Sequence, residues 1–272
     1  MNDYPILILG TNGNIARELL LSFPAARVVA RSEYLTWMEG GAYSVNSFLR
    51  NLKTTPKIIF NCVGVTNPAA NESLLLKLNY ELPKLLINSV TDGETTIVTF
   101  GTVMENLKQY AHSNNYLKSK LLFHEWLHDQ NRNDKFLHLQ LHTLYGGSNI
   151  HGHMFLGQIF NALKKQEKFS MSSGIQIREY HHIQDDVSAA LEIVDQGLSG
   201  VLPISHGNPE KLRDLAHFIF SYFDCLNLLD IGKVKASEFD SMRPISQVNH
   251  KFLKTQFRDT KTGIIGWLSA NL

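Results

Sequence analysis

The sequence has little of several features that mark specialised classes of protein. Its two cysteines, Cys62 and Cys225, are far apart and are interpreted as free thiols. Lys and Arg (26) nearly balance Asp and Glu (25), which argues against binding to nucleic acid. No apolar run reaches the ~18–20 residues that a membrane span needs, and the N-terminus lacks the basic start of a signal peptide. We therefore expect a cytoplasmic enzyme with no nucleic-acid or membrane partner.

The sequence does contain short apolar runs that alternate with helical patterns. The runs carry apolar residues continuously, as do strands of a parallel sheet covered by helices on both faces. The predicted strands are residues 6–9, 27–30, 42–45, 57–62, 96–100 and 136–141, and the predicted helices are 14–22, 73–90 and 116–129. This alternation predicts an α/β fold, with a Rossmann-type doubly wound parallel sheet.

The pattern loosens after Gly146, where Gly and Ser become commoner. Helices are predicted at 155–165, 185–194, 210–223 and 262–270, and strands at 175–182 and 201–204. We predict a first domain at 1–148 and a smaller discontinuous C-terminal lobe at 149–272, with some segments returning to the core. Open α/β folds bind ligands beyond the carboxyl ends of their strands, so the lobe is expected to bind substrate.

A glycine turn follows the first predicted strand. Gly10, Gly13 and Ala16 have the spacing that binds the pyrophosphate of a dinucleotide, where glycines allow a tight turn and a close backbone approach. The following helix N-terminus offers free N–H groups to the phosphates. The alternative is a plain strand–helix turn. The residues expected to bind cofactor here are Gly10, Asn12, Gly13, Asn14 and Ile15.

The end of the second predicted strand selects the form of the cofactor. NAD sites place an acidic residue there for the ribose hydroxyls, whereas this chain has Arg31 and Ser32, which suit a 2′-phosphate. Glu33 leaves the alternative open, because a shift of register would bring a carboxylate to the ribose. The sequence favours NADP(H), with NAD(H) possible.

Tyr116 and Lys120 are four residues apart and share one face of a predicted helix. A tyrosine with its ordinary pKa of ~10 is a poor acid–base catalyst near neutrality, and a neighbouring ammonium lowers that pKa. The same spacing occurs at Tyr80 and Lys84. We exclude that second pair because Pro83 interrupts its helix, whereas Tyr116 follows the end of a strand.

A series of family motifs spans almost the whole chain in order. They are GTNGNIA, NCVGVTNPAANE, Asn79 in KLNYE, Tyr116-x-x-x-Lys120, Tyr145-Gly146, REYHHIQDD and Arg243-Pro244. On these motifs the chain resembles the short-chain dehydrogenase/reductase superfamily. It is most similar to the extended branch that modifies nucleotide sugars, the NAD-dependent epimerase/dehydratase family.

The resemblance implies further cofactor and catalytic residues. Cys62, Val63, Gly64, Asn79 and Lys120 are expected to border the cofactor. A Ser or Thr after the fifth core strand is expected to bond the reacting oxygen, together with Tyr116 and Lys120. Thr102 is the favoured residue and Thr99 the second candidate. Phe100 departs from the family, because a hydroxyl residue usually occupies its place.

The resemblance also implies a substrate site. Arg178 and Arg243 are expected to bind the diphosphate of a nucleotide sugar, and two guanidinium groups can clamp such a group through paired donors. Each arginine could instead form an ordinary surface ion pair. Asn67 and Tyr180 are expected to line the sugar pocket. No metal is expected, because the twelve histidines show no recognisable set of ligands.

Three functions remain open from the sequence. The leading hypothesis is an NADP(H)-dependent reductase of a 4-keto-6-deoxy nucleotide sugar, because Val103 and Met104 replace the Asp-Glu pair of dehydratases in this branch. The alternatives are an epimerase with tightly held NAD and a non-catalytic NADP-binding sensor. Two broadly apolar helices, at 73–90 and 116–129, indicate a possible homodimer.

Overall fold

Six parallel strands form the sheet of one of the two units into which the chain folds. The computed structural model describes residues 5–109, 114–129, 136–235 and 253–272. Unit 1 comprises residues 1–141 and 193–203, and unit 2 comprises 142–192 and 204–272. The chain therefore leaves unit 1 after residue 141 and returns to it at residues 193–203, which include one more strand.

The sheet of unit 1 has the strand order β2-β1-β3-β4-β5-β10, and every neighbouring pair is parallel. β2 lies on one side of β1, and β3, β4, β5 and β10 follow in turn on its other side. This is the doubly wound arrangement. The predicted fold class is confirmed. The strands are β1 (Ile6–Leu9), β2 (Arg27–Val29), β3 (Ile58–Asn61), β4 (Thr96–Thr102), β5 (Phe136–Leu141) and β10 (Gly200–Pro203).

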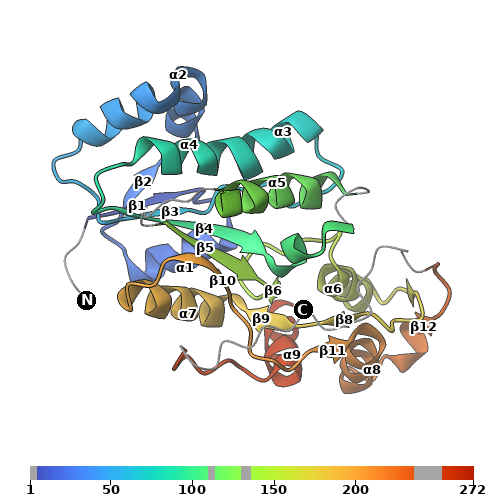
Figure 1. The fold of residues 1–272 in the computed structure, drawn as a ribbon. Helices are drawn as coiled ribbons and strands as arrows, with labels where there is room; N and C mark the ends of the chain where they lie inside the picture. Colours follow the sequence, from blue (N-terminus) through green and yellow to red (C-terminus); the bar gives the residue numbers. More distant parts are fainter. Residues whose placement is uncertain (1–4, 110–113, 130–135, 236–252) are drawn as a thin grey trace. The chain divides into compact units, whose positions relative to one another are not determined.

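Helices cover both faces of this sheet, with α1 on one face and α2 to α5 on the other (Figure 1). Apolar side chains from the strands pack against α2, α4 and α5, with Trp37, Leu82 and Phe123 almost fully buried. This core explains why the strands carry continuous apolar runs. The helices are α1 (Asn14–Ser22), α2 (Arg31–Arg50), α3 (Glu72–Leu76), the π-helix η1 (Lys77–Glu81), α4 (Leu82–Ser89), the 3₁₀-helix η2 (Val103–Asn106) and α5 (Asn115–Asp129).

One predicted element of unit 1 was wrong. Residues 42–45 belong to the helix α2 and not to a strand, and Val45 is fully buried on its apolar face. The helix bends at Gly41 (φ +61°), so the kink interrupts its apolar period and hides the helical pattern. The helix predicted at 73–90 is confirmed: α3, the π-helix η1 and α4 follow one another without a break from Glu72 to Ser89. Pro83 has no N–H to donate, and the π-turn that ends with the Leu82 N–H donating to the Lys77 carbonyl lies just before it.

Unit 2 combines three two-stranded sheets with four α-helices and a 3₁₀-helix in its described residues. Its core is formed by apolar residues of α6, α8 and α9, among them Ile159, Ile219 and Leu268, which are fully buried. The predicted strand 175–182 is two short strands, with Glu179 between them. The elements are β6 (Thr143–Tyr145), α6 (Phe155–Lys165), β7 (Phe169–Met171), β8 (Ile177–Arg178), β9 (Tyr180–His182), α7 (Ile183–Asp195), β11 (Glu210–Lys211), α8 (Leu212–Tyr222), the 3₁₀-helix η4 (Leu226–Leu228), β12 (Leu229–Ile231) and α9 (Thr260–Asn271).

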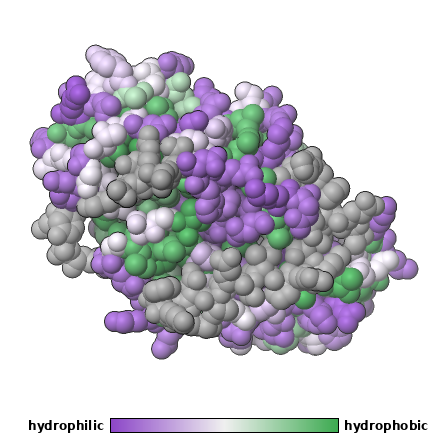
Figure 2. Space-filling view, in the orientation of Figure 1, coloured by the Kyte–Doolittle hydropathy of each residue, from purple (hydrophilic) through white to green (hydrophobic). Residues whose placement is uncertain are grey.

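Hydrophilic residues cover much of the face shown in Figure 2. The most exposed large apolar side chains of unit 1, Tyr43 on α2 and Leu21 on α1, lie on different helices. Within the described residues, no helix combines the length and the apolar character that a membrane crossing requires.

Candidate functional site

The turn between β1 and α1 requires its first glycine. Gly10 has φ +82°, and a Cβ there would lie 2.7 Å from the backbone of Cys62 and Val63 at the end of β3. The Gly13 N–H donates to the Gly10 carbonyl (2.9 Å), and Gly13 is the N-cap of α1. Ala16 is fully buried. No acidic residue stands in the first turn of α1, so its partial positive charge is available to an anion.

The remaining predicted residues of this turn start the helix. Asn14 and Ile15 are the first two residues of α1 and are partly buried, and Asn12 in the turn is exposed. The glycine-turn residues therefore lie next to the predicted residues at the end of β3, because β1 and β3 are neighbouring parallel strands whose carboxyl ends meet there.

Asn79 ties the loop after β3 to the helices. Its Oδ1 accepts from the Val65 N–H and its Nδ2 donates to the Val65 carbonyl, each at 2.9 Å, and Nδ2 also donates to the Ser119 hydroxyl. A Cβ on Gly64 would lie 3.3 Å from Asn79 Oδ1 and 4.0 Å from Lys120 Nζ. Predicted cofactor residues from β3, the π-helix and α5 therefore converge, and π-helices are frequent at functional sites.

Thr102, Tyr116 and Lys120 come from adjoining elements, since Thr102 ends β4 and α5 packs against β4 and η2. The Lys120 ammonium is buried and donates to the Phe100 carbonyl (2.7 Å). Burial lowers the pKa of Lys120 and the charge of Glu105 opposes this. Burial raises the pKa of the half-buried Tyr116, and Glu105 raises it further. Tyr116 therefore keeps its proton in the protein without cofactor.

Thr99 and Thr102 differ in their contacts. Thr99 is buried, and its hydroxyl lies 2.7 Å from Nδ1 of His138. Thr102 is partly exposed, and its hydroxyl accepts a long hydrogen bond from the Met104 N–H (3.3 Å). Thr102 is therefore the one of the two that is accessible to a ligand.

The sequence interpretation missed a buried polar cluster beside these residues. Glu105 Oε1 accepts from the Thr102 N–H (2.8 Å), and Oε2 lies 3.0 Å from His138 Nε2 and accepts from Gln140 Nε2 (3.2 Å). Burial raises the pKa of Glu105, but His138, Lys120 and the Thr102 N–H outweigh burial, and the pKa lies below its ordinary value. Two signals were visible: the capping-box spacing Thr102–Glu105 and the polar alternation of His138 and Gln140 in a buried strand.

Arg31 and Ser32 are the first residues of α2, and both are exposed. Glu33, the acidic alternative, is engaged elsewhere. Its carboxylate accepts from the Ala30 N–H (2.6 Å) and forms an ion pair with Arg27 (2.7 Å). The Arg31 guanidinium and the Ser32 hydroxyl therefore lie at the start of α2, while the Glu33 carboxylate accepts from the N-cap residue, Ala30.

Asn67 lies in an exposed turn of unit 1, where its side chain accepts from the Ala69 N–H (3.0 Å). Cys62 and Val63 are partly buried, and burial raises the pKa of the Cys62 thiol, so this cysteine stays neutral. Arg243 and Pro244 lie outside the described residues.

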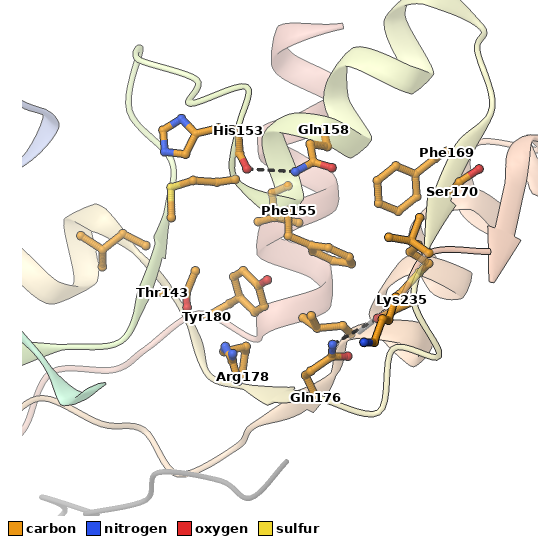
Figure 3. Close-up of a pocket in the computed structure, with 17 residues that line it drawn as sticks. Thr143, His153, Phe155, Gln158, Phe169, Ser170, Gln176, Arg178, Tyr180 and Lys235 are labelled. Atoms are coloured by element: carbon orange, nitrogen blue, oxygen red, sulfur yellow. Dashed lines mark hydrogen bonds between the residues drawn. The ribbon is translucent and has the colours of Figure 1, made fainter. Parts of the chain in front are cut away.

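Unit 2 contains a cavity of about 470 Å³ that brings Arg178 and Tyr180 together (Figure 3). Arg178 and Lys235 supply cationic groups to its lining, and Phe155 and Phe169 supply aromatic rings. Arg178 Nη1 donates to the Ile177 carbonyl (2.8 Å). Cations, aromatic rings and amides around one concave space are the groups that recognise a nucleotide with its phosphates.

Glu179, between β8 and β9, is held by a second buried cluster. His181 lies between Glu179 Oε1 (2.8 Å) and Asp186 Oδ1 (2.6 Å), and despite the opposing effect of burial these two carboxylates raise its pKa to about 9. Ligand atoms of His142, Glu179 and His181 lie within 4.8 Å of one another, as a metal would require. The bonds of the cluster already satisfy Glu179 and His181, so we interpret it as an ion triad that fixes the strands carrying Arg178 and Tyr180.

Comparison with known proteins identifies the family to which the chain is similar. A model of the NAD dependent epimerase/dehydratase family matches residues 6–203. None of the curated proteins compared with the chain matches it.

Similar solved structures agree in fold. UDP-N-acetylglucosamine 4-epimerase from Methanobrevibacter ruminantium is 10% identical, with a TM-score of 0.78 and 100% of both chains covered. A dTDP-4-dehydrorhamnose reductase from Clostridium acetobutylicum is 20% identical, with a TM-score of 0.73 and 98% of this chain and 99% of that chain covered. RMD from Pseudomonas aeruginosa, complexed with NADPH, is 15% identical, with a TM-score of 0.70 and coverage of 98% and 100%. At such identities the likeness concerns the fold.

Proposed function

The chain belongs to the NAD dependent epimerase/dehydratase family, and on that premise we propose that it is an NADP(H)-dependent reductase of a keto group on a nucleotide-activated sugar. As a member of this family it is an NAD(P)-dependent enzyme of the short-chain dehydrogenase/reductase type. The observation that carries the proposal is that α5, with Tyr116 and Lys120, packs against the strand β4 that ends at Thr102, and that Lys120 Nζ lies 4.0 Å from the Cβ position of Gly64 in the loop after β3.

Reduction of a ketone needs a hydride at carbon and a proton at oxygen. NADPH, if held by the residues of unit 1 described above, would supply the hydride. The Tyr116 hydroxyl donates the proton to the carbonyl oxygen as the new C–H bond forms, and solvent restores the proton afterwards. Thr102 donates a hydrogen bond to the same oxygen, which stabilises the negative charge that develops there. Burial and Glu105 raise the pKa of Tyr116, so the residue is in the neutral form that a proton donor needs, although a raised pKa also makes it a weaker acid.

Unit 1 is proposed to bind the cofactor. The glycine turn and the α1 N-terminus suit the pyrophosphate, and the segment Cys62–Gly64 with Asn79 and Lys120 borders the remainder. Arg31 and Ser32 suit a 2′-phosphate, and Glu33 is bonded to Ala30 and Arg27, which supports NADP(H) over NAD(H).

The cofactor preference is tested by Arg31→Ala. Loss of a charge-assisted contact should raise KM for NADPH about tenfold to a hundredfold and leave KM for NADH nearly unchanged. The matched control is Arg50→Ala, which removes an exposed arginine from the last turn of the same helix, α2. An equal loss with both cofactors would show that Arg31 does not contact a 2′-phosphate.

Unit 2 is proposed to bind the nucleotide diphosphate of the substrate. The Arg178 guanidinium and the Lys235 ammonium suit the phosphates, and Phe155, Phe169 and Tyr180 suit the base and ribose. Val103 and Met104 offer no acid–base groups for a dehydration step, which favours a reductase over a dehydratase, and we propose a 4-keto-6-deoxy sugar as its substrate.

The proposal is tested by following NADPH consumption over a panel of 4-keto nucleotide sugars, with NADH in parallel. We expect stoichiometric oxidation of NADPH with at least one member. If the protein purifies with tightly bound NAD and interconverts sugar epimers without net oxidation, it is an epimerase. If it binds NADPH but turns over no sugar, it is a non-catalytic NADP-binding protein.

A further inference from the structure

The ion triad of Glu179, His181 and Asp186 leaves one buried neighbour without a role. The side chain of His142 is 5% exposed, and within the described residues its Nε2 has no hydrogen-bond partner. That nitrogen lies 3.8 Å from Glu179 Oε2, which is too long for a hydrogen bond. Burying a polar atom without a partner is costly. The nitrogen and the oxygen are therefore suited to an ion that binds both.

The register of two parallel strands brings these groups together. β6 pairs with β9 so that Thr143 is opposite Tyr180, and the Thr143 N–H donates to the Glu179 carbonyl (3.1 Å). His142 and Glu179 each stand one residue before these partners, and His181 lies two residues after Glu179, on the same face. Tyr180, on the alternate face, lines the cavity of Figure 3. Sequence spacing predicted no metal site, because strand pairing brings His142 to the other two residues.

The ligand groups and their surroundings match those of a zinc site. Two imidazoles and one carboxylate are a known ligand set for Zn²⁺. Ligand atoms of His142, Glu179 and His181 lie within 4.8 Å of one another. His181 presents Nε2 to Glu179, and its Nδ1 lies 2.6 Å from Asp186 Oδ1. A carboxylate that accepts from the far nitrogen of a ligating histidine fixes the tautomer of that histidine, as in many metal sites.

Glu179 is held in place and can still coordinate an ion. The main-chain N–H groups of residues 206 and 207 donate to Oε1, and the Ser205 hydroxyl lies 3.0 Å from Oε2. A carboxylate oxygen has two lone pairs, so Oε2 can accept from Ser205 and bind an ion as well. The nearby His206 is excluded as a ligand, because main-chain groups bond to both of its ring nitrogens.

We propose that His142, Glu179 and His181 form a binding site for one divalent transition-metal ion, Zn²⁺ by preference, that fixes the strand behind the cavity of unit 2. Two nitrogen ligands favour Zn²⁺ over Mg²⁺ and Ca²⁺, which prefer oxygen. With both carboxylates ionised, the ion triad has one negative charge in excess. A dication that replaces the proton between His181 and Glu179, and releases it to solvent, removes this excess. A water molecule completes the coordination.

Titration of the full-length protein with Zn²⁺ tests the site. After dialysis against a chelator, calorimetry with zinc sulfate should show one equivalent bound per chain, and calorimetry with magnesium sulfate should show none. His142→Phe removes the unpartnered nitrogen and keeps a ring beside His181, so the affinity for Zn²⁺ should fall about 100-fold. His182→Phe is the matched control, because it removes the next imidazole of β9, which points to the other face.

Thermal unfolding gives a second measurement, since an ion that binds the native protein stabilises it. Excess Zn²⁺ should raise Tm by about 5 °C in the unaltered protein and in His182→Phe, and by less than about 1 °C in His142→Phe. Absence of stoichiometric binding by the unaltered protein would overturn the site. Equal affinity in His142→Phe would do the same, because it would assign the ion to other histidines.

Two further measurements keep the test decisive. If His142→Phe does not fold, Co²⁺ added to the unaltered protein should give the intense visible bands of a four- or five-coordinate ion, and the weak bands of a six-coordinate ion would overturn the site. Asp186→Asn should weaken Zn²⁺ binding about tenfold to a hundredfold. These titrations need neither nicotinamide cofactor nor sugar, so their outcome is independent of the proposed reductase activity.

Discussion

The chain contains two Tyr-x-x-x-Lys pairs whose spacing is identical and whose surroundings differ. In the first, Lys84 donates to the Tyr80 hydroxyl (3.2 Å), and its ammonium lies over the rings of Tyr80 (5.2 Å) and Trp126 (5.5 Å). In the second pair, the ammonium of Lys120 donates to the Phe100 carbonyl. The charge of the buried Glu105 acts to raise the pKa of both Tyr116 and Lys120.

From this difference we propose that direct contact between the two side chains is not what makes such a pair catalytic. The Lys84 ammonium contacts the rings of Tyr80 and Trp126, and we propose that these cation–π contacts give it a structural role. Lys120 instead lies 4.0 Å from the position of a Cβ on Gly64, in the loop that is expected to border cofactor. The end of a strand, a neighbouring charge and a cofactor loop distinguish the second pair.

The largest expected difference concerns the two tyrosines. Tyr116→Phe should lower kcat for the reduction about 10³-fold or more, because it removes the proton donor. Tyr80→Phe should leave kcat within about twofold, because the Tyr80 hydroxyl accepts from Lys84. Steady-state NADPH oxidation measures both. An unchanged rate in Tyr116→Phe with every accepted substrate would end the proposal that this pair is catalytic.

Local sequence predicted much of the fold, because its signals act within a few residues. The bounds of α1, β5 and α6 agree with the prediction, since a glycine turn precedes α1, β5 is a short run rich in apolar residues, and α6 has apolar residues at helical spacing. The signal failed at residues 42–45, where the kink at Gly41 breaks the helical period of α2.

The buried cluster around Glu105 could not be predicted in the same way. His138 is paired with Thr99 across the sheet, and Gln140 with Gly101, so the cluster depends on strand register. A sequence shows that His138 and Gln140 are polar residues in an apolar run. It does not show that a carboxylate more than thirty residues away will bond to both.

The two threonines of β4, Thr99 and Thr102, also differ in their contacts, so their variants are expected to differ in activity. Thr102→Val should lower kcat about 10²-fold, because it removes a hydrogen-bond donor to the reacting oxygen, whereas Thr102→Ser should retain most of the activity. Thr99→Val should leave kcat nearly unchanged and cost about 1 kcal/mol of stability, because it breaks the contact with His138. A loss of activity confined to Thr99→Val would make Thr99 the catalytic hydroxyl.

The smallest expected effect concerns the lysine of the first pair. Lys84→Met removes the ammonium and keeps the apolar stem against Trp126, so the free energy of unfolding should fall by about 0.5–1 kcal/mol with kcat unchanged. Denaturant unfolding measures the change. Lys118→Met is the matched control, since its exposed ion pair with Glu72 should contribute less. A kcat reduced tenfold in Lys84→Met, without loss of stability, would place the first pair in the reaction and remove the distinction between the two.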